Sequence, residues 1–203
     1  MNEQKRAVAD HPIQVWVAER WSPYSFADRP VSADDLRSVF EAARWTASSY
    51  NEQPWSYIVA TQTRPEAFAK LLACLVEGNR GWAAAAPVLA LGCMGLTFAR
   101  NGQINAAAAH DLGGAGASLT LEATARGLSV HQMIGILPEV ARGQYGIPEG
   151  VQALTALAIG YAADPIPEAL RARDSAPRSR KPLPEFVFAG AWGTASEIVG
   201  GAV

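Results

Sequence analysis

The feature that most constrains this chain is a long helical stretch, roughly residues 105 to 126, built largely from small side chains. It contains Ala106 to Ala109, then the run Gly113-Gly114-Ala115-Gly116-Ala117, and Gly127 closes it. Each glycine costs a helix up to about 1 kcal/mol relative to alanine. So many glycines are tolerated where another helix must approach closely. The stretch therefore predicts a close helix–helix contact, within the chain or between two subunits.

The rest of the chain alternates between helical and strand patterns. Ser32 precedes two acids and predicts the start of a helix that ends between Trp45 and Ala47. A second helix is expected from Pro65 to Gly78, and a short helical piece before Pro87. Strands are expected at residues 55–61, 88–94, 128–136 (ending in a turn), 151–162 and 186–188.

Composition excludes several classes of protein. The chain has 203 residues, of which 49% are hydrophobic, and its net charge is −2. These values exclude a disordered chain and argue against a nucleic-acid binder, which needs surplus cations. Only 18% of residues are charged, where soluble domains have about 25%. Either the composition is simply rich in alanine and glycine, or part of the surface is hidden in an oligomer.

Two further patterns bear on compartment and redox state. Cys74 and Cys93 lie in apolar surroundings and predict buried free thiols, with no Cys/His cluster for zinc. Residues 81–99 carry no charge, but Pro87 interrupts them, and a spanning helix needs about 20 apolar residues. The first residues form no hydrophobic run. We expect a soluble cytoplasmic protein with no membrane partner.

Local signatures of the common catalytic sites are missing. The chain lacks G-x-S-x-G, H-E-x-x-H and the phosphate-binding G-x-x-x-x-G-K-[ST]. Gly114 and Gly116 do not form a dinucleotide fingerprint, since no third glycine follows at the required spacing. His11, His110 and His131 leave a serine hydrolase open as an alternative that no motif supports. An enzyme built from this chain is expected to take its chemistry from a cofactor.

Three polar clusters remain. In Arg20-Trp21-Ser22, the guanidinium and the hydroxyl could face one anion, or Arg20 could simply lie at the surface. The run from Ser48 to Gln53 is typical of a turn, but it also offers hydrogen bonds of both polarities to a heterocycle edge such as that of a flavin. Arg178-Ser179-Arg180-Lys181 is either a solvated linker or a second contact to the same phosphate.

Taken in order, these motifs resemble those of the FMN-dependent nitroreductase family, over roughly residue 10 to Trp192. The most specific part is Ser48-Ser49-x-Asn51-x-Gln53-Pro54-Trp55. The resemblance implies an α+β fold with a central mixed or antiparallel sheet flanked by helices. It also implies one domain, residues 1–203, with residues 164–203 as an extended C-terminal arm. Two chains would form an intertwined homodimer that exchanges these arms.

The resemblance also implies which residues bind FMN. Arg20 and Ser22 would hold the phosphate, with Trp21 contributing through its backbone. Ser48, Ser49 and Asn51 would line the flavin of the partner subunit, and Asn79 would contact its pyrimidine side. The remaining implied contacts are the loop Met133-Ile134-Gly135, whose backbone N–H faces flavin N5, and Arg178, Arg180 or Lys181 on the phosphate. His131 and Gln132 either reach this pocket or only end a strand.

Tyr24 departs from the family pattern, which has arginine or lysine two residues after the serine. A cation there stabilises the negative charge that grows on the flavin during reduction. Because Tyr24 donates only a neutral hydrogen bond, we expect a lower flavin potential than in relatives, unless Arg80 or another cation substitutes. A redox titration of Tyr24→Arg tests this, and an unchanged midpoint contradicts it.

The activity implied is reduction of a nitroaromatic, quinone or activated alkene with NADH or NADPH, in a ping-pong reaction. It needs no metal and no catalytic side chain, since flavin N5 is the reactive centre. The alternatives are an FMN store or sensor with little turnover, and a flavin enzyme that cleaves flavin or removes halogens. The sequence selects neither the small-molecule acceptor nor the nicotinamide donor.

Overall fold

The computed structural model describes residues 3–200, and its centre is a four-stranded sheet whose neighbouring strands all run antiparallel. The sheet has the order β1-β2-β4-β3. The strands are β1 (Trp55–Thr61), β2 (Val88–Gly95), β3 (Ser129–Met133) and β4 (Val151–Gly160). The expected α+β fold is therefore confirmed, with an antiparallel sheet.

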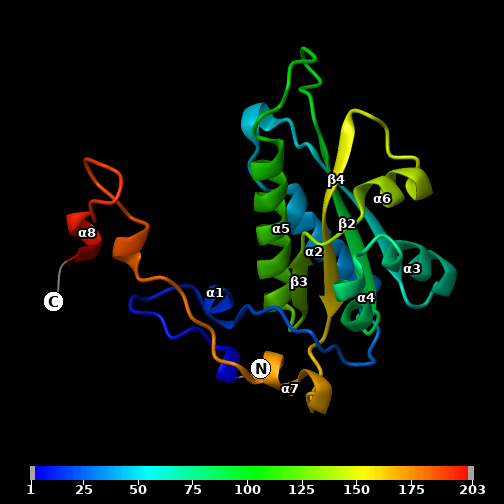
Figure 1. Cartoon of the computed structure of the whole chain (residues 1–203), viewed down its shortest axis with the longest axis horizontal. Coiled ribbons are helices and arrows are strands. Elements are labelled where there is room, and N and C mark those ends of the chain that lie inside the picture. The colour runs from blue at the N-terminus through cyan, green and yellow to red at the C-terminus, as the bar shows by residue number, and fades with distance from the viewer. Residues whose placement is uncertain (1–2, 201–203) are drawn as a thin grey trace.

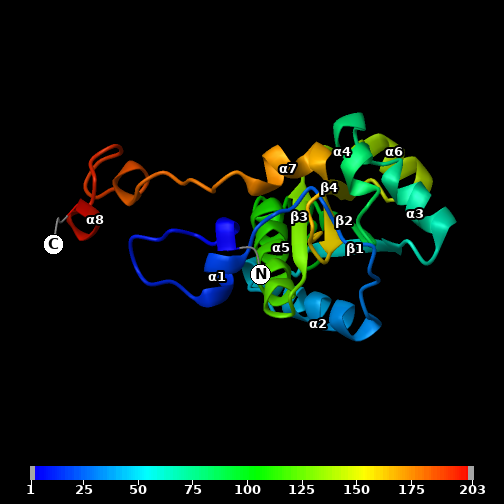
Figure 2. The same ribbon diagram turned by 90° about the horizontal axis from the view of Figure 1, so that it is seen from below.

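Helices cover both faces of this sheet (Figure 2). One face carries α2 (Ala33–Arg44) and α5 (Ala108–Ala125). The other carries α3 (Pro65–Leu72), α4 (Glu77–Ala83) and α6 (Pro138–Tyr145). Both faces of β2 are thus buried, which explains why its sequence is apolar throughout instead of alternating.

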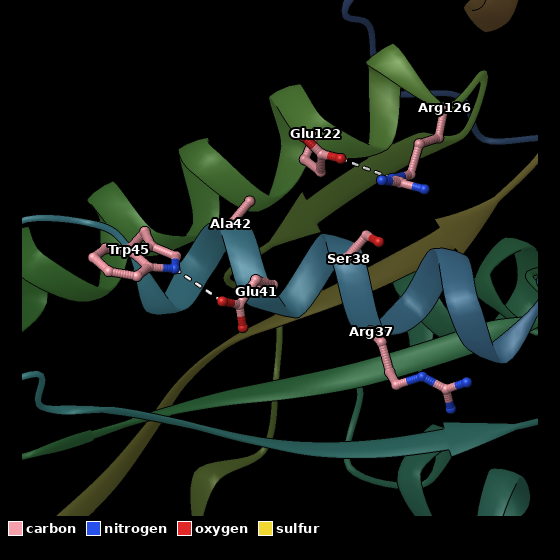
Figure 3. A pocket seen from close by; sticks show the side chains of 7 residues that line it. All are labelled: Arg37, Ser38, Glu41, Ala42, Trp45, Glu122 and Arg126. Carbon is pink, nitrogen blue, oxygen red and sulfur yellow. Dashed lines mark hydrogen bonds and ion pairs between the residues drawn. The ribbon is translucent and has the colours of Figure 1, made fainter.

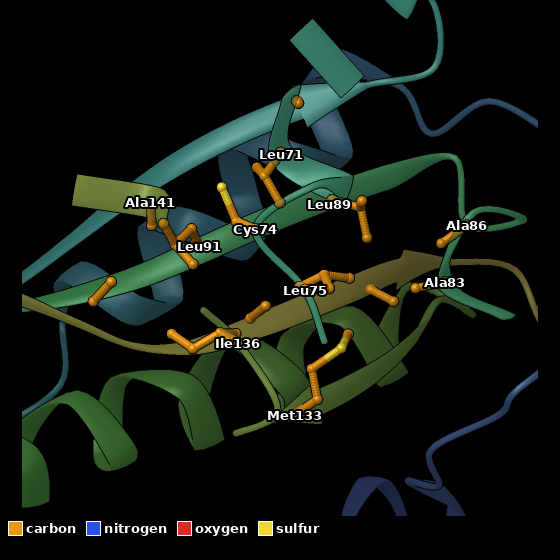
Figure 4. Packing of buried hydrophobic residues seen from close by; sticks show 14 of the residues in the cluster. Leu71, Cys74, Leu75, Ala83, Ala86, Leu89, Leu91, Met133, Ile136 and Ala141 are labelled. Atoms are coloured by element: carbon orange, nitrogen blue, oxygen red, sulfur yellow. The ribbon is translucent and has the colours of Figure 1, made fainter. Parts of the chain in front are cut away.

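The side chains of β2 divide between two cores. Val88 and Ala90 point to the layer of α2 and α5, whereas Leu89 and Leu91 point to the layer of α3, α4 and α6. In the second layer Leu71 and Leu75 pack over the sheet (Figure 4). Cys74 and Cys93 belong to this core as free, buried thiols, as predicted.

The predicted start of α2 is confirmed. Ser32 Oγ accepts a hydrogen bond of 3.0 Å from Asp35 N, which satisfies one of the free N–H groups of the first turn. The helix ends at Arg44, close to the expected boundary.

The helix expected from Pro65 to Gly78 is wrong in its extent. It ends at Leu72, and Gly78 lies inside the separate helix α4. The break has a tertiary cause, because Leu75 pairs with Ile136 and Val76 N donates to Gly135 O at 3.1 Å. The chain between the two helices therefore pairs with the loop after β3 and leaves the helical path.

The small residues of α5 have more than one neighbour. A Cβ at Gly114 would lie 3.1 Å from Thr46 Cγ2, just past the end of α2, so the expected approach of another helix occurs within the chain. At Gly116 the neighbour is a side chain instead, since a Cβ there would lie 2.8 Å from Gln132 Oε1. A Cβ at Gly113 would meet nothing within 4 Å, and Gly113 and Ala117 are exposed. One face of α5 is thus uncovered in the single chain.

The C-terminal segment leads away from the sheet (Figure 1). It leaves the body at α7 (Glu168–Ser175) and ends in a short turn and helix. The strand expected at residues 186–188 is wrong, because Phe188 forms only an isolated bridge with Ala195. A strand needs a neighbour of matching length, and this segment has none among residues 3–200.

The remaining elements are η1 (Glu3–Lys5), α1 (Val15–Glu19), η2 (Ser49–Asn51), η3 (Leu183–Glu185) and α8 (Glu197–Gly200). Residues 1, 2 and 201–203, the ends of the expected domain and arm, lie outside the described residues. Among residues 3–200, no helix has the length and apolar character to cross a membrane.

Candidate functional site

The segment after α1 forms one wall of a cavity of about 350 Å³. Arg20 Nη1 donates a hydrogen bond of 3.1 Å to Ser22 Oγ, so the two side chains act at one place. The opposite wall comes from α5 and β3. The residues that line the cavity are Val17, Arg20, Ser22, Ala117, Thr120, Leu121, Val130 and Gln132.

Two arginines of the arm come to the same segment. Arg178 donates from Nη2 to Ala18 O at 2.6 Å and from Nη1 to Arg20 O. Its Nε is buried and has no hydrogen-bond partner among the described residues. The pKa of Arg20 is lowered, mainly by burial and then by the charge of Arg180. The pKa of Arg178 is also lowered, mainly by burial and then by the charges of Arg20 and Arg180. Arg178 therefore contacts the backbone of the Arg20 segment, and the exposed Arg180 lies near enough for its charge to act on both arginines.

No carboxylate in the described part of the chain forms an ion pair with these three arginines. Three cations that repel one another beside a hydroxyl make a site for an anion with more than one charge, and guanidinium geometry suits phosphate. Lys181, the other cation of the motif, is exposed.

A buried carboxylate fixes the base of the arm. Asp174 is 1% exposed and accepts hydrogen bonds from Tyr24 N (2.9 Å), Ser25 N (2.9 Å) and Ser25 Oγ (2.5 Å). Lys5 Nζ donates to Ala176 O at 2.6 Å, and it lies 5.4 Å from the ring centroid of the buried Trp21. The sequence analysis missed both Asp174 and Lys5, because no local pattern marks either residue.

An aromatic cluster supports the next part of this segment. The ring of Tyr24 lies 5.1 Å from that of Trp82 and 4.7 Å from that of His131, and Arg173 Cζ lies 4.8 Å from the Tyr24 ring. His131 Nδ1 donates to Pro23 O at 2.8 Å, and burial lowers the pKa of this imidazole. His131 therefore packs under the segment as a neutral ring.

Gln132 points to the other face of β3, toward α5. Its Nε2 donates to Gly116 O at 3.0 Å and to Thr120 Oγ1 at 2.9 Å. Of the two residues left open by the sequence, Gln132 lines the cavity and His131 does not. Thr120 is a cavity residue that the sequence analysis missed, because it looks like an ordinary helix residue.

The polar loop between α2 and β1 holds an unusual backbone. Tyr50, Asn51 and Gln53 have φ values of 54°, 56° and 51°, and each such residue costs about 1–3 kcal/mol when it is not glycine. Two hydrogen bonds hold this conformation: Gln53 N donates to Ser48 Oγ at 3.0 Å, and Ser49 N donates to Asp111 Oδ2 at 3.1 Å. Strain of this kind is concentrated at functional sites.

A single chain does not bring this loop to the arginine cavity. The loop contacts α5 at Asp111, whereas the cavity contacts it at Thr120. Thr120 is nine residues from Asp111 and Ala117, the nearest cavity residue of α5, is six, which is about 9–14 Å at 1.5 Å per residue. Ser48, Ser49 and Asn51 thus lie at one end of α5, and Arg20 and Ser22 lie nearer the other.

The loop after β3 forms the third part of the predicted site. Asn79 Nδ2 donates to Gly135 O at 3.0 Å, and a Cβ at position 135 would lie 2.5 Å from that nitrogen, so any larger residue there would displace the Asn79 side chain. Met133 is buried and Ile134 is 78% exposed. Since Met133 directly follows Gln132, this loop starts beside the cavity.

A second, open cavity of about 460 Å³ lies on the outer side of α2 and α5 (Figure 3). Its charged groups are already neutralised within the chain, since Arg126 pairs with Glu122 at 2.8 Å and Arg44 pairs with Glu41. No residue singled out from the sequence lines it. Among residues 3–200 there is no cluster of side chains that could hold a metal ion.

Comparison with known proteins gives consistent results. The family model described as "Nitroreductase family" matches residues 17–161. A crystal structure of an FMN-containing oxidoreductase is 28% identical, covers 95% of this chain and 98% of its own, and has a TM-score of 0.85. A nitroreductase family protein from Clostridium difficile has a TM-score of 0.68 at 24% identity, over 87% of this chain and 96% of its own, and shares the fold.

Two relatives match in sequence. An uncharacterized 15.4 kDa protein of Mycolicibacterium smegmatis is 38% identical over 63% of this chain and 86% of its own length. A Streptomyces coelicolor protein named "Putative NADH dehydrogenase/NAD(P)H nitroreductase" is 41% identical over 34% of this chain, and the match spans only 33% of that relative. The family model covers most of the chain and includes the cavity, so this protein belongs to the Nitroreductase family.

Proposed function

We propose that this protein is an FMN-dependent oxidoreductase that takes a hydride from NADH or NADPH and reduces a nitroaromatic, a quinone or an activated alkene. The observation that carries the proposal is the contact of Arg20 with Ser22 and of Arg178 with the backbone at Arg20, with the charge of Arg180 acting on both, beside a largely apolar cavity in a member of this family. A molecule that carries a phosphate and a flat ring matches this site, because the phosphate suits the arginines and the ring suits the apolar cavity.

The residues present fit FMN. Arg178 has a buried Nε without a partner, and the three guanidinium groups lack a neutralising carboxylate among the described residues. Arg20, Ser22, Arg178 and Arg180 would hold the phosphate. The loop from Met133 to Gly135, with Asn79 tied to it, would lie against the ring. Bound FMN supplies two-electron transfer between a nicotinamide and an acceptor.

The overall reaction balances without a catalytic side chain. NAD(P)H gives up a hydride, which is two electrons and one proton, and a quinone takes up two electrons and two protons. Solvent provides the second proton. The donor leaves before the acceptor takes the same place, in a ping-pong order. The chain binds and orients both molecules and excludes water from the ring.

We further propose that the working form is a homodimer of single-domain chains that exchange their C-terminal arms. The uncovered face of α5, around Gly113 and Ala117, can accept a second helix. Ser48, Ser49 and Asn51 lie at the other end of α5 from the arginine cavity, and in the proposed dimer they would serve the partner's FMN. The exposed Trp192 of the arm would be covered by the partner.

The test begins with the purified protein, which should be yellow or should bind added FMN. It should oxidise NADH or NADPH when menadione or a nitroaromatic is added. A protein that binds no FMN contradicts the proposal. A protein that binds FMN but shows no steady turnover with any of these acceptors is a flavin store or sensor.

A further inference from the structure

An exposed group of side chains at one end of the molecule is independent of the arginine cavity. The segment between β2 and α5 forms a hairpin, residues 96–105, that projects past the end of the sheet (Figure 1). Thr97 pairs with Ile104, and Phe98 N donates to Gln103 O at 2.8 Å. Gly102 takes the left-handed φ of 69° that the turn requires. The hairpin is therefore an ordered element.

The hairpin is joined to the strained loop that carries Ser48, Ser49 and Asn51. Ala99 N donates a hydrogen bond of 2.7 Å to Glu52 Oε1. The rings of Tyr50 and Phe98 meet edge to face, with their centroids 5.7 Å apart. Whatever the loop binds, the hairpin lies at the edge of the same place.

Arg100 completes this surface. Its Cζ lies 4.0 Å from the Tyr50 ring centroid and 5.3 Å from that of Phe98. Stacking holds the flat guanidinium and leaves its N–H edges available. No ion pair in the described part of the chain includes Arg100, and the nearby Glu52 accepts from Ala99 instead. Tyr50 and Ile104, 74% and 81% exposed, add apolar surface beside it.

We propose that Arg100, supported by Tyr50 and Phe98, recognises an anionic group attached to a planar ring on the molecule that this enzyme reduces or oxidises. The inference rests on the proposed function, which places the 48–54 loop at the partner's FMN. An aromatic acceptor with a carboxylate or sulfonate carries such a group, and NADPH offers a comparable anion, the 2′-phosphate on the ribose beside its planar adenine ring. Arg100 is thereby a residue that determines specificity, with no part in the electron transfer.

The experiment compares matched substrates in the flavin-loaded protein. Menadione is neutral and 1,4-naphthoquinone-2-sulfonate is anionic, and NADPH differs from NADH by one phosphate. In Arg100→Gln we expect KM to rise about tenfold for the anionic member of at least one pair, with kcat unchanged, as for the loss of one charge-assisted hydrogen bond. The pair that responds identifies the source of the anion.

Two further variants and a binding measurement complete the test. Arg100→Lys keeps the charge but loses the flat guanidinium, so its KM for the anionic substrate should lie between those of wild type and Arg100→Gln. Arg64→Gln removes an exposed arginine at the opposite end of β1 and should change nothing. Naphthalene-2-sulfonate, which cannot be reduced, should bind the wild-type holoprotein more tightly than Arg100→Gln in calorimetry.

The outcomes are distinguishable. If wild type binds no FMN and reduces neither quinone, the proposed function fails. If wild type does both, but Arg100→Gln and Arg100→Lys leave the ratio of KM values unchanged in both substrate pairs, only this inference is overturned.

Discussion

Arg180 is expected to have opposite effects on the protein with and without a bound anion. Its charge lowers the pKa of both Arg20 and Arg178, so it repels them when no anion is present. In Arg180→Gln we expect Tm of the FMN-free protein to rise at low salt, where repulsion is least screened. FMN should bind about threefold to tenfold more weakly, as for loss of one charged contact. Thermal melts and flavin fluorescence titrations measure the two effects.

The control is Arg64→Gln, which removes the same charge from an exposed position far from the cavity. If Arg180→Gln lowers Tm of the FMN-free protein, or leaves FMN affinity unchanged, the three guanidinium groups do not form one anion site.

His131 makes stability depend on pH in a defined window. Burial lowers the pKa of its imidazole in the folded protein below the ordinary value of 6.5, although the bond to Pro23 opposes this in part. Between the lowered pKa and 6.5, the unfolded chain therefore binds more protons than the folded one, so stability falls as pH falls through this window. Tm of wild type should drop more steeply from pH 7 to pH 5 than that of His131→Gln.

Carboxylates contribute to any acid destabilisation, so the informative quantity is the difference in slope between the two proteins. The exposed His11 gives a matched control, because His11→Gln should retain the wild-type slope. Equal slopes in all three proteins would contradict a half-buried, neutral His131.

At the residue scale, a contact could be predicted only when its two residues lie close together in the sequence. Arg20 and Ser22 are two residues apart, so their spacing allowed a common orientation but left a surface position for Arg20 equally open. Asp174 could not be predicted, because its partner Tyr24 lies 150 residues away and only the folded chain brings them together. The pairing of Arg178 with the same segment was suggested by the family resemblance, since its own motif is equally typical of a solvated linker.

At the scale of elements, local patterns predicted what local interactions determine. The start of α2 depends on Ser32 and Asp35 within one turn, and β1 was predicted with both of its ends. The break between α3 and α4 was not predicted, since it depends on pairing of Val76 with Gly135 across the sheet. Phe188 has the side chain of a strand residue but lacks a neighbouring strand.

The uncovered face of α5 allows a test of this element. In a single chain a Cβ at Gly113 meets nothing within 4 Å, so a larger side chain there has room. If the partner's helix packs on this face, Gly113→Leu should block it and yield monomers in sedimentation velocity. Gly143→Leu is the matched control, because Gly143 is also helical, exposed and without neighbours within 4 Å.

If Gly113→Leu sediments as the wild-type protein does, the dimer contact lies elsewhere. In that event the glycine has no packing role, and Gly113→Ala should stabilise the chain by about 1 kcal/mol through helix propensity alone. If the proposed dimer is correct, Gly113→Ala should stabilise the protein by less than this or should destabilise it.

At the scale of the whole molecule, the parts of the site lie in two places that one chain does not join. The arginine cavity and the loop after β3 lie together, while the strained loop with Ser48, Ser49 and Asn51 lies about 9–14 Å away along α5. The arm also leaves the body (Figure 2), and its aromatic residues Phe186 and Trp192 are exposed. The proposed dimer would account for both facts, since a second copy of the chain would complete each cavity and cover each arm.

This arrangement links cofactor binding to assembly. If both chains contact each FMN, FMN must favour the dimer by the same free energy by which dimerisation favours FMN. Apparent FMN affinity should therefore increase with protein concentration across the range in which sedimentation shows dimers forming, and added FMN should shift that range lower. In Gly113→Leu, FMN should bind about tenfold more weakly or worse, a loss of ~1.4 kcal/mol, although Arg20, Ser22 and Arg178 are intact. A monomer that binds FMN with the full affinity of the dimer would show that the arginine cavity of one chain is sufficient and that the Ser48–Asn51 loop contributes nothing to the cofactor.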